Sequence, residues 1–152
     1  MNLATDRISN QNKSPQPALE TYSILLAEDD RHMADLLAAN LRRLGHRVVG
    51  MGRNGREAVE LASKTNPDVV ILDIEMPILT GLQAAREILA SRPVPIVMST
   101  GVSDIRSLQN AADLKLVSYL VKPYSPAQLK VSIHLAVAQA RAVAQPESPA
   151  TA

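Results

Sequence analysis

Short apolar runs alternate with amphipathic stretches along most of the chain, from about residue 22 to residue 142. A continuous apolar run of five or six residues is typical of a strand that is covered on both faces. Five such strands are expected, at residues 22–27, 47–51, 68–73, 95–100 and 117–121. Helical spacing of the apolar residues elsewhere predicts helices at about residues 31–44, 55–65, 81–91, 104–112 and 126–142.

Start and stop signals flank these helices. Asp30 stands where it can cap the first helix, Gly45 where a helix-ending glycine belongs, and Pro126 in the first turn of the last helix. Asn66-Pro67 ends the second helix, because the residue before a proline avoids helical geometry. The core-facing stripe of the first helix is expected to comprise Met33, Leu36, Leu37, Leu41 and Leu44. That of the last helix is expected to comprise Leu129, Ile133, Ala136, Val137 and Ala140.

Strands that alternate with helices predict a parallel sheet with right-handed crossovers and helices on both faces. Five units of this length fit a flavodoxin-like, doubly wound α/β sheet with strand order 2-1-3-4-5. Residues 1–20 and 143–152 are polar or proline-containing and lack apolar periodicity. Because such segments bury too little apolar surface to offset ordering entropy, we expect a disordered N-terminal arm, one folded domain at residues 21–142 and a flexible C-terminal tail.

Composition narrows the range of functions. Of 152 residues, 46% are hydrophobic but only 2% are aromatic, with no Phe or Trp, so the core must be aliphatic. Sixteen basic and fifteen acidic residues give a net charge of +1, and no block of like charge indicates DNA or membrane binding. The absence of cysteine excludes disulfides and thiol chemistry. With no apolar leader or membrane-length stretch in the sequence, we expect a cytoplasmic protein.

Carboxylates gather at one predicted edge of the sheet. Ligands of such sheets bind beyond the carboxyl ends of the strands where the strand order reverses, here between strands one and three. Glu28, Asp29 and Asp30 follow the first strand, and Asp73 ends the third. Asp30 is accounted for as a helix cap, but two carboxylates about 4 Å apart repel by about 4 kcal/mol at a dielectric constant of about 20. A divalent cation offsets that repulsion, and Mg²⁺ suits a site with few carboxylates and an incoming phosphate.

Two further groups are expected at the same edge. The fourth strand ends in Ser99-Thr100-Gly101, which supplies a hydroxyl, and the fifth is followed by Lys122-Pro123, which supplies an ammonium. A metal ion, a lysine and a hydroxyl together neutralise the oxygens of a transferring phosphoryl group. A carboxylate can then act as the nucleophile. Asp73 is the best candidate, because it is central in the sheet with the metal ligands beside it.

Four motifs, in this order along the chain, resemble the stand-alone, CheY-like receiver domains of two-component response regulators. They are Glu28-Asp29, LDIEMPILTG (72–81), Thr100-Gly101 and YLVKP (119–123), and the likeness covers about residues 22–140. The resemblance implies that Asp73 accepts a phosphoryl group, which Thr100 and Lys122 contact. The residues that it implies as ligands of Mg²⁺, or of Mn²⁺ in its place, are Glu28, Asp29, Asp73 and, through its backbone carbonyl, Glu75.

The resemblance also implies a switch and a set of partners. Thr100 would move toward the phosphoryl group, and Tyr119, at the family's aromatic switch position, would rotate inward. The alternative is a Tyr119 half-buried on an edge strand with its hydroxyl in water. The phosphodonor would be a histidine kinase or a histidine phosphotransfer protein. The chain, as a monomer or a phosphorylation-dependent dimer, would signal through the face of its fourth helix, fifth strand and fifth helix, or pass the group onward.

Such a chain is a signalling phosphoacceptor and not an enzyme, although it assists its own phosphorylation and dephosphorylation. Residues 111–119 depart from the family, being slightly longer than usual and lacking the common glycine, and Val102 is apolar where many relatives are polar. We predict that Val102 and Glu75 influence the lifetime of the phosphorylated state. No DNA-binding or enzymatic output domain is expected after residue 142. YLVKPYSPAQLK (119–130) resembles receivers that precede an RNA-binding antitermination bundle, but no such bundle follows in this sequence.

Three alternatives are open. Residues 50–55 spell G-x-G-x-x-G, a dinucleotide-binding motif, but they follow the second strand and leave the acids, Thr100 and Lys122 unexplained. An FMN-binding flavodoxin shares the fold, but here the first strand leads into acids instead of a phosphate-cradling loop. The third alternative is a docking module that works without phosphorylation, although every residue needed for phosphorylation is present.

Overall fold

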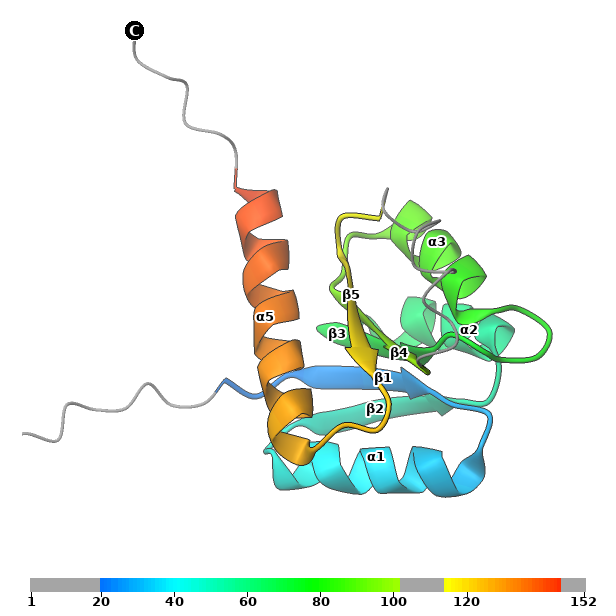
Figure 1. Ribbon diagram of the computed structural model, residues 1–152. Coiled ribbons are helices and arrows are strands. Elements are labelled where there is room, and N and C mark those ends of the chain that lie inside the picture. The colour runs from blue at the N-terminus through cyan, green and yellow to red at the C-terminus, as the bar shows by residue number, and fades with distance from the viewer. Residues whose placement is uncertain (1–19, 102–113, 146–152) are drawn as a thin grey trace, which may run out of the picture.

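The five expected strands form a single parallel sheet in the order β2-β1-β3-β4-β5, which confirms the flavodoxin-like fold (Figure 1). The computed structural model describes residues 20–101 and 114–145. Its strands are β1 (Ser23–Ala27), β2 (Arg47–Gly52), β3 (Val69–Asp73), β4 (Ile96–Thr100) and β5 (Val117–Val121). Its helices are α1 (Arg31–Arg43), α2 (Gly55–Thr65), α3 (Gly81–Ser91) and α5 (Pro126–Ala144). The helix expected at 104–112 lies outside the described residues, as does Val102.

The helices cover both faces of the sheet. Figure 1 shows α1 and α5 on one side and α2 and α3 on the other. Each side has its own aliphatic cluster, because side chains alternate between the two faces of a strand. Leu26 and Ile71 contribute to the cluster under α1 and α5, whereas the neighbouring Leu25 and Val70 contribute to the one under α2 and α3. None of the helices in the described segments combines the length and apolarity that a membrane span requires.

The predicted helix signals form in the structure. Asp30 caps α1 by accepting a hydrogen bond from the Met33 amide at 3.1 Å, and Gly45 follows α1 with a left-handed φ of 91°. Asn66 ends α2, also in a left-handed conformation. Pro126 opens α5, which ends two residues beyond the expected position 142.

The expected core stripe of α1 was wrong in two positions. Met33 and Leu36 are 43% and 56% exposed, whereas Leu37 is buried. The buried face of α1 consists of Ala34, Leu37, Ala38 and Leu41. Small alanine side chains let this helix approach the sheet closely, so the contact stripe is narrower than the run of leucines and methionine suggested.

The strand register brings the strand ends together at one edge. Ala27 of β1 pairs with Leu72 of β3, so Glu28 and Asp73 follow at neighbouring positions. Asp73 in turn pairs with Ser99 of β4. Thr100 pairs with Val121, which places Lys122 directly beyond it. All four strands therefore deliver their terminal side chains to the same edge.

Candidate functional site

Three carboxylates converge at the carboxyl edge of the sheet. Glu28, Asp29 and Asp73 each offer a carboxylate oxygen within 4.8 Å of those of the other two. Glu28 is buried, Asp73 is partly buried and Asp29 is exposed to solvent. The cluster thus has a buried floor and an open side, as a site that admits a ligand from solvent requires.

Lys122 lies between two of these carboxylates. Its Nζ is 3.2 Å from Glu28 Oε2 and 3.1 Å from Asp73 Oδ2. The three side chains are only 27%, 8% and 12% exposed, respectively. The ammonium therefore offsets part of the carboxylate repulsion in a setting where water screens it poorly.

Backbone amides fix the orientation of the same carboxylates. The Asp30 amide donates to Glu28 Oε1 at 3.2 Å, and the Glu75 amide donates to Asp73 Oδ1 at 3.1 Å. Each of these carboxylates is thus held by an amide on one oxygen and by Lys122 on the other. This arrangement leaves little rotational freedom at the centre of the site.

The close packing of charges changes the pKa values of two site residues. Burial, together with the hydrogen bond and negative charge of Asp73, raises the pKa of Glu28 to about 7. Burial alone would lower the pKa of Lys122, but Asp73 and Glu28 outweigh it and raise that pKa above its usual value. The site therefore holds more negative charge than Lys122 neutralises, and it favours the binding of a further cation or proton.

The two expected switch residues lie at the end of β4 and on β5. Thr100 is fully buried, and its hydroxyl donates to the Gly101 carbonyl at 3.0 Å. Tyr119 packs against the cluster under α2 and α3, and its hydroxyl is buried. The alternative in which this hydroxyl lies in water does not hold in the structure.

The donor set fits a small, hard divalent cation. A cluster of carboxylate oxygens with one side open to solvent suits Mg²⁺, since this ion binds oxygen and keeps several waters. Mn²⁺ accepts the same ligands. The predicted carbonyl ligand, Glu75, follows Asp73 by two residues, at the start of the β3–α3 loop.

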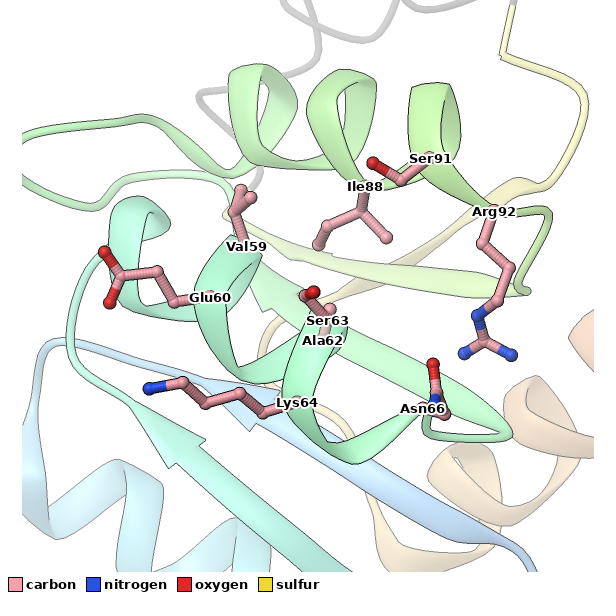
Figure 2. A pocket seen from close by; sticks show the side chains of 9 residues that line it. All are labelled: Val59, Glu60, Ala62, Ser63, Lys64, Asn66, Ile88, Ser91 and Arg92. Atoms are coloured by element: carbon pink, nitrogen blue, oxygen red, sulfur yellow. The ribbon is translucent and has the colours of Figure 1, made fainter.

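Two other features of the described residues, the G-x-G-x-x-G motif and a hollow between α2 and α3, do not involve the carboxylates, Thr100 or Lys122. The G-x-G-x-x-G motif lies on β2 and the start of α2, and the Gly55 amide already donates to the Leu79 carbonyl at 3.1 Å. A dinucleotide pyrophosphate would need that amide. A hollow of about 560 Å³ between α2 and α3 (Figure 2) contains none of the candidate site residues, and it lies toward the opposite ends of the strands.

Sequence reasoning missed several features of the site. It did not anticipate that Lys122 would bridge Glu28 and Asp73, nor that the Asp30 and Glu75 amides would hold these carboxylates. It interpreted Gly55 only as a helix start. The position of Lys122 directly after the fifth strand was the one sequence feature that could have predicted its contacts with Glu28 and Asp73. The contact between Gly55 and Leu79 joins the start of α2 to the loop after β3, and no sequence motif spans these two segments.

Fold and site together define a flavodoxin-like domain with a lysine-bridged cluster of carboxylates at the carboxyl ends of its strands. The response regulator receiver domain family matches residues 24–134. The chain therefore belongs to the response regulator receiver domain family, which is consistent with two-component signalling.

Individual relatives agree with this assignment. Transcriptional regulatory protein PdtaR of Mycobacterium tuberculosis is 42% identical over 120 residues, which cover 79% of this chain and 58% of PdtaR. The probable transcriptional regulator ycf27 of Guillardia theta is 37% identical over 116 residues, covering 76% of this chain and 45% of ycf27. The chain thus spans about half the length of these two relatives.

A solved structure gives the same result. The signal receiver domain of a modulated diguanylate cyclase from Desulfovibrio desulfuricans G20 superposes with a TM-score of 0.74 at 31% identity. The superposition covers 82% of this chain and 99% of that domain. The likeness therefore extends over an entire receiver domain.

Proposed function

We propose that this protein accepts a phosphoryl group on Asp73 from a phosphohistidine of a histidine kinase or histidine phosphotransfer protein, in a Mg²⁺-dependent reaction. The single observation that carries the proposal is the cluster of Glu28, Asp29 and Asp73, with carboxylate oxygens within 4.8 Å of one another and Lys122 bridging two of them. Membership of the receiver family supports the same function.

In the proposed transfer, one Asp73 carboxylate oxygen attacks the phosphorus atom while the bond from phosphorus to the donor histidine nitrogen breaks. The electron pair of that bond returns to the imidazole, and an acyl phosphate forms on Asp73. Glu28, Asp29, Asp73 and the Glu75 carbonyl would hold a Mg²⁺ ion, which would supply positive charge to the phosphoryl oxygens.

Lys122 and Thr100 supply the remaining contacts to the phosphoryl group. Lys122 Nζ already lies beside Asp73 Oδ2, so a small movement brings it to an oxygen of the transferred phosphoryl group. Thr100 must exchange its hydrogen bond with the Gly101 carbonyl for one with the phosphoryl group. The protein returns to its starting state when water attacks the phosphorus and Asp73 leaves as a carboxylate.

Thr100 would then form a contact in the phosphorylated protein that is absent from the unphosphorylated protein. A ligand can shift a conformational equilibrium only through such a difference in contacts. When Thr100 moves, the packing of Tyr119 against the cluster under α2 and α3 also changes. This change alters the surface around β5 and α5. A downstream protein reads that surface, or the phosphoryl group passes onward to another histidine. The protein carries out this signalling in the cytoplasm, without direct DNA contact, as a monomer or a phosphorylation-dependent dimer.

Labelling with a small phosphodonor tests the proposal. The purified protein is incubated with acetyl phosphate and Mg²⁺, and its intact mass is measured. We expect one added phosphoryl group in the wild type, and none in Asp73→Asn or when EDTA is present. No labelling of the wild type by acetyl phosphate or by any host kinase would instead support a docking module that works without phosphorylation. Labelling of Asp73→Asn at the wild-type rate would assign the reaction to another residue.

A further inference from the structure

Close backbone contacts join the two ends of the loop that follows Asp73, residues 74–80, and join this loop to α2. At its C-terminal end the Gly81 amide donates to the Ile74 carbonyl at 2.9 Å, and a Cβ on Gly81 would lie 2.0 Å from the Asp73 carbonyl oxygen. Near that end, the Gly55 amide of α2 donates to the Leu79 carbonyl at 3.1 Å. A Cβ on Gly55 would lie 2.1 Å from the same oxygen, so only glycine permits this contact.

The same loop contains a strained turn. The Leu79 amide donates to the Pro77 carbonyl at 2.8 Å, which closes a three-residue γ-turn centred on Ile78. Ile78 has a φ of 72°, which is a rare conformation for a β-branched residue. Its side chain is 80% exposed, so side-chain burial does not stabilise this conformation. Strain of this kind persists only where the surroundings impose it.

The loop is in direct contact with the proposed phosphoacceptor. Its second residue, Glu75, donates its amide to Asp73 Oδ1 at 3.1 Å. Further along, Met76 is buried and Leu79 packs against the cluster under α2 and α3. A shift of the loop at Leu79 therefore changes the position of the Glu75 amide and with it the Asp73 carboxylate.

We propose that Gly55 is a positioning residue for Asp73. Its contact with Leu79 holds the strained loop 74–80 in place, so that the Glu75 amide fixes the carboxylate that faces the cation. The inference rests on the proposed function of Asp73, and it assigns to the start of α2 a role in shaping a site that it does not touch.

The substitution Gly55→Ala tests this role. Loop and helix must separate on the order of 1 Å, since non-bonded heavy atoms do not approach as closely as the added Cβ would require. We expect the dissociation constant for Mg²⁺, measured by calorimetry, to rise about tenfold or more, as is usual when the support of a metal ligand is lost. We also expect slower labelling by acetyl phosphate and a shifted amide resonance of Glu75 in ¹⁵N NMR spectra.

Gly50→Ala is the matched control. A Cβ on Gly50 would lie 2.9 Å from Leu25 Cδ1 and 3.6 Å from Leu61 Cδ2 of α2, so it perturbs the packing of α2 without reaching Leu79. We expect the wild-type Mg²⁺ affinity and the wild-type Glu75 resonance in this variant. A general disturbance of α2 would instead affect both variants alike.

Ile78→Gly separates positioning from simple destabilisation. Glycine adopts positive φ without strain, so we expect this variant to have a higher midpoint of thermal unfolding than the wild type. In the double variant Gly55→Ala/Ile78→Gly the turn no longer needs to be held. We therefore expect it to recover much of the Mg²⁺ affinity lost in Gly55→Ala, as a non-additive effect.

Unchanged Mg²⁺ affinity in a folded Gly55→Ala, additive losses in the double variant, or a lower thermal midpoint for Ile78→Gly would each overturn the proposal. If Gly55→Ala does not fold, the Ile78→Gly midpoint still tests it. If the wild type itself binds no Mg²⁺ and takes no label, the proposed function fails. The Glu75 resonance and the thermal midpoints, which need no metal, then test the loop contact alone.

Discussion

Replacing Lys122 by methionine removes the only cation that the described structure places between Glu28 and Asp73. The ammonium contacts the two carboxylates at 3.2 and 3.1 Å. Methionine keeps most of the aliphatic stem, so the substitution removes charge more than volume. The variant therefore measures what the positive charge contributes to the folded state.

The structure sets the size of the expected effect. At an effective dielectric constant of about 20, each contact contributes about 5 kcal/mol of Coulomb attraction before desolvation is subtracted. Removing one partner of a buried ion pair typically costs about 3–5 kcal/mol. Glu28 can relieve part of the repulsion by taking up a proton, because its pKa is already raised to about 7. At pH about 8 without divalent cations, we expect a loss of about 3 kcal/mol in the free energy of unfolding.

Urea unfolding followed by far-ultraviolet circular dichroism measures this loss, with EDTA present to remove cations. Arg56→Met is the matched control, because Arg56 pairs with Glu87 at 2.9 Å but the two side chains are 47% and 43% exposed. An exposed pair contributes about 1 kcal/mol or less, so this variant should remain close to the wild type. Added Mg²⁺ should stabilise Lys122→Met more than the wild type, since the ion takes over the role of the ammonium.

Two outcomes would refute this reasoning. Equal losses for Lys122→Met and Arg56→Met would show that the carboxylates are as well solvated as a surface pair. An equal response of the wild type and Lys122→Met to Mg²⁺ would show that the cation and the lysine do not act on the same carboxylates.

Three further predictions concern pH and packing. The pKa of Glu28 is raised from 4.5 to about 7, so its contribution to stability is complete below pH 4.5 and is lost as the pH rises to 7. The free energy of unfolding should therefore fall by about 3 kcal/mol over this range. In urea titrations without metal, Glu28→Gln should abolish this dependence of the free energy of unfolding on pH. Burial, with a smaller effect of His134, lowers the pKa of His46, whose Nδ1 accepts the Tyr22 amide at 3.2 Å. Its contribution is therefore present above pH 6.5 and lost on acidification, and His46→Gln should flatten the acid side of the stability profile. Finally, Leu37→Ala should cost about 2–4 kcal/mol and the adjacent Leu36→Ala less than about 0.5 kcal/mol, and equal losses in chemical unfolding would contradict the observed orientation of α1.

The outline of the site was predictable because strand ends are local features of the sequence. An apolar run that stops at Glu28 and another that stops at Asp73 identify two strand ends, and the strand order of a doubly wound sheet makes them neighbours. The same argument placed Thr100 and Lys122 at that edge. Their proposed roles toward a phosphoryl group come from the family resemblance and from chemistry, and labelling experiments test them.

The sequence by itself determined the elements, the fold class and the edge of the sheet that carries the carboxylates, because periodicity and strand termini are properties of neighbouring residues. Only the tertiary structure decided that Leu37 and not Leu36 enters the core, since the rotation of α1 depends on how closely its alanines approach the sheet. It also decided the two contacts of Lys122 and the close approach of Gly55 to Leu79. These contacts depend on distances between segments far apart along the chain, which packing sets and local sequence does not encode.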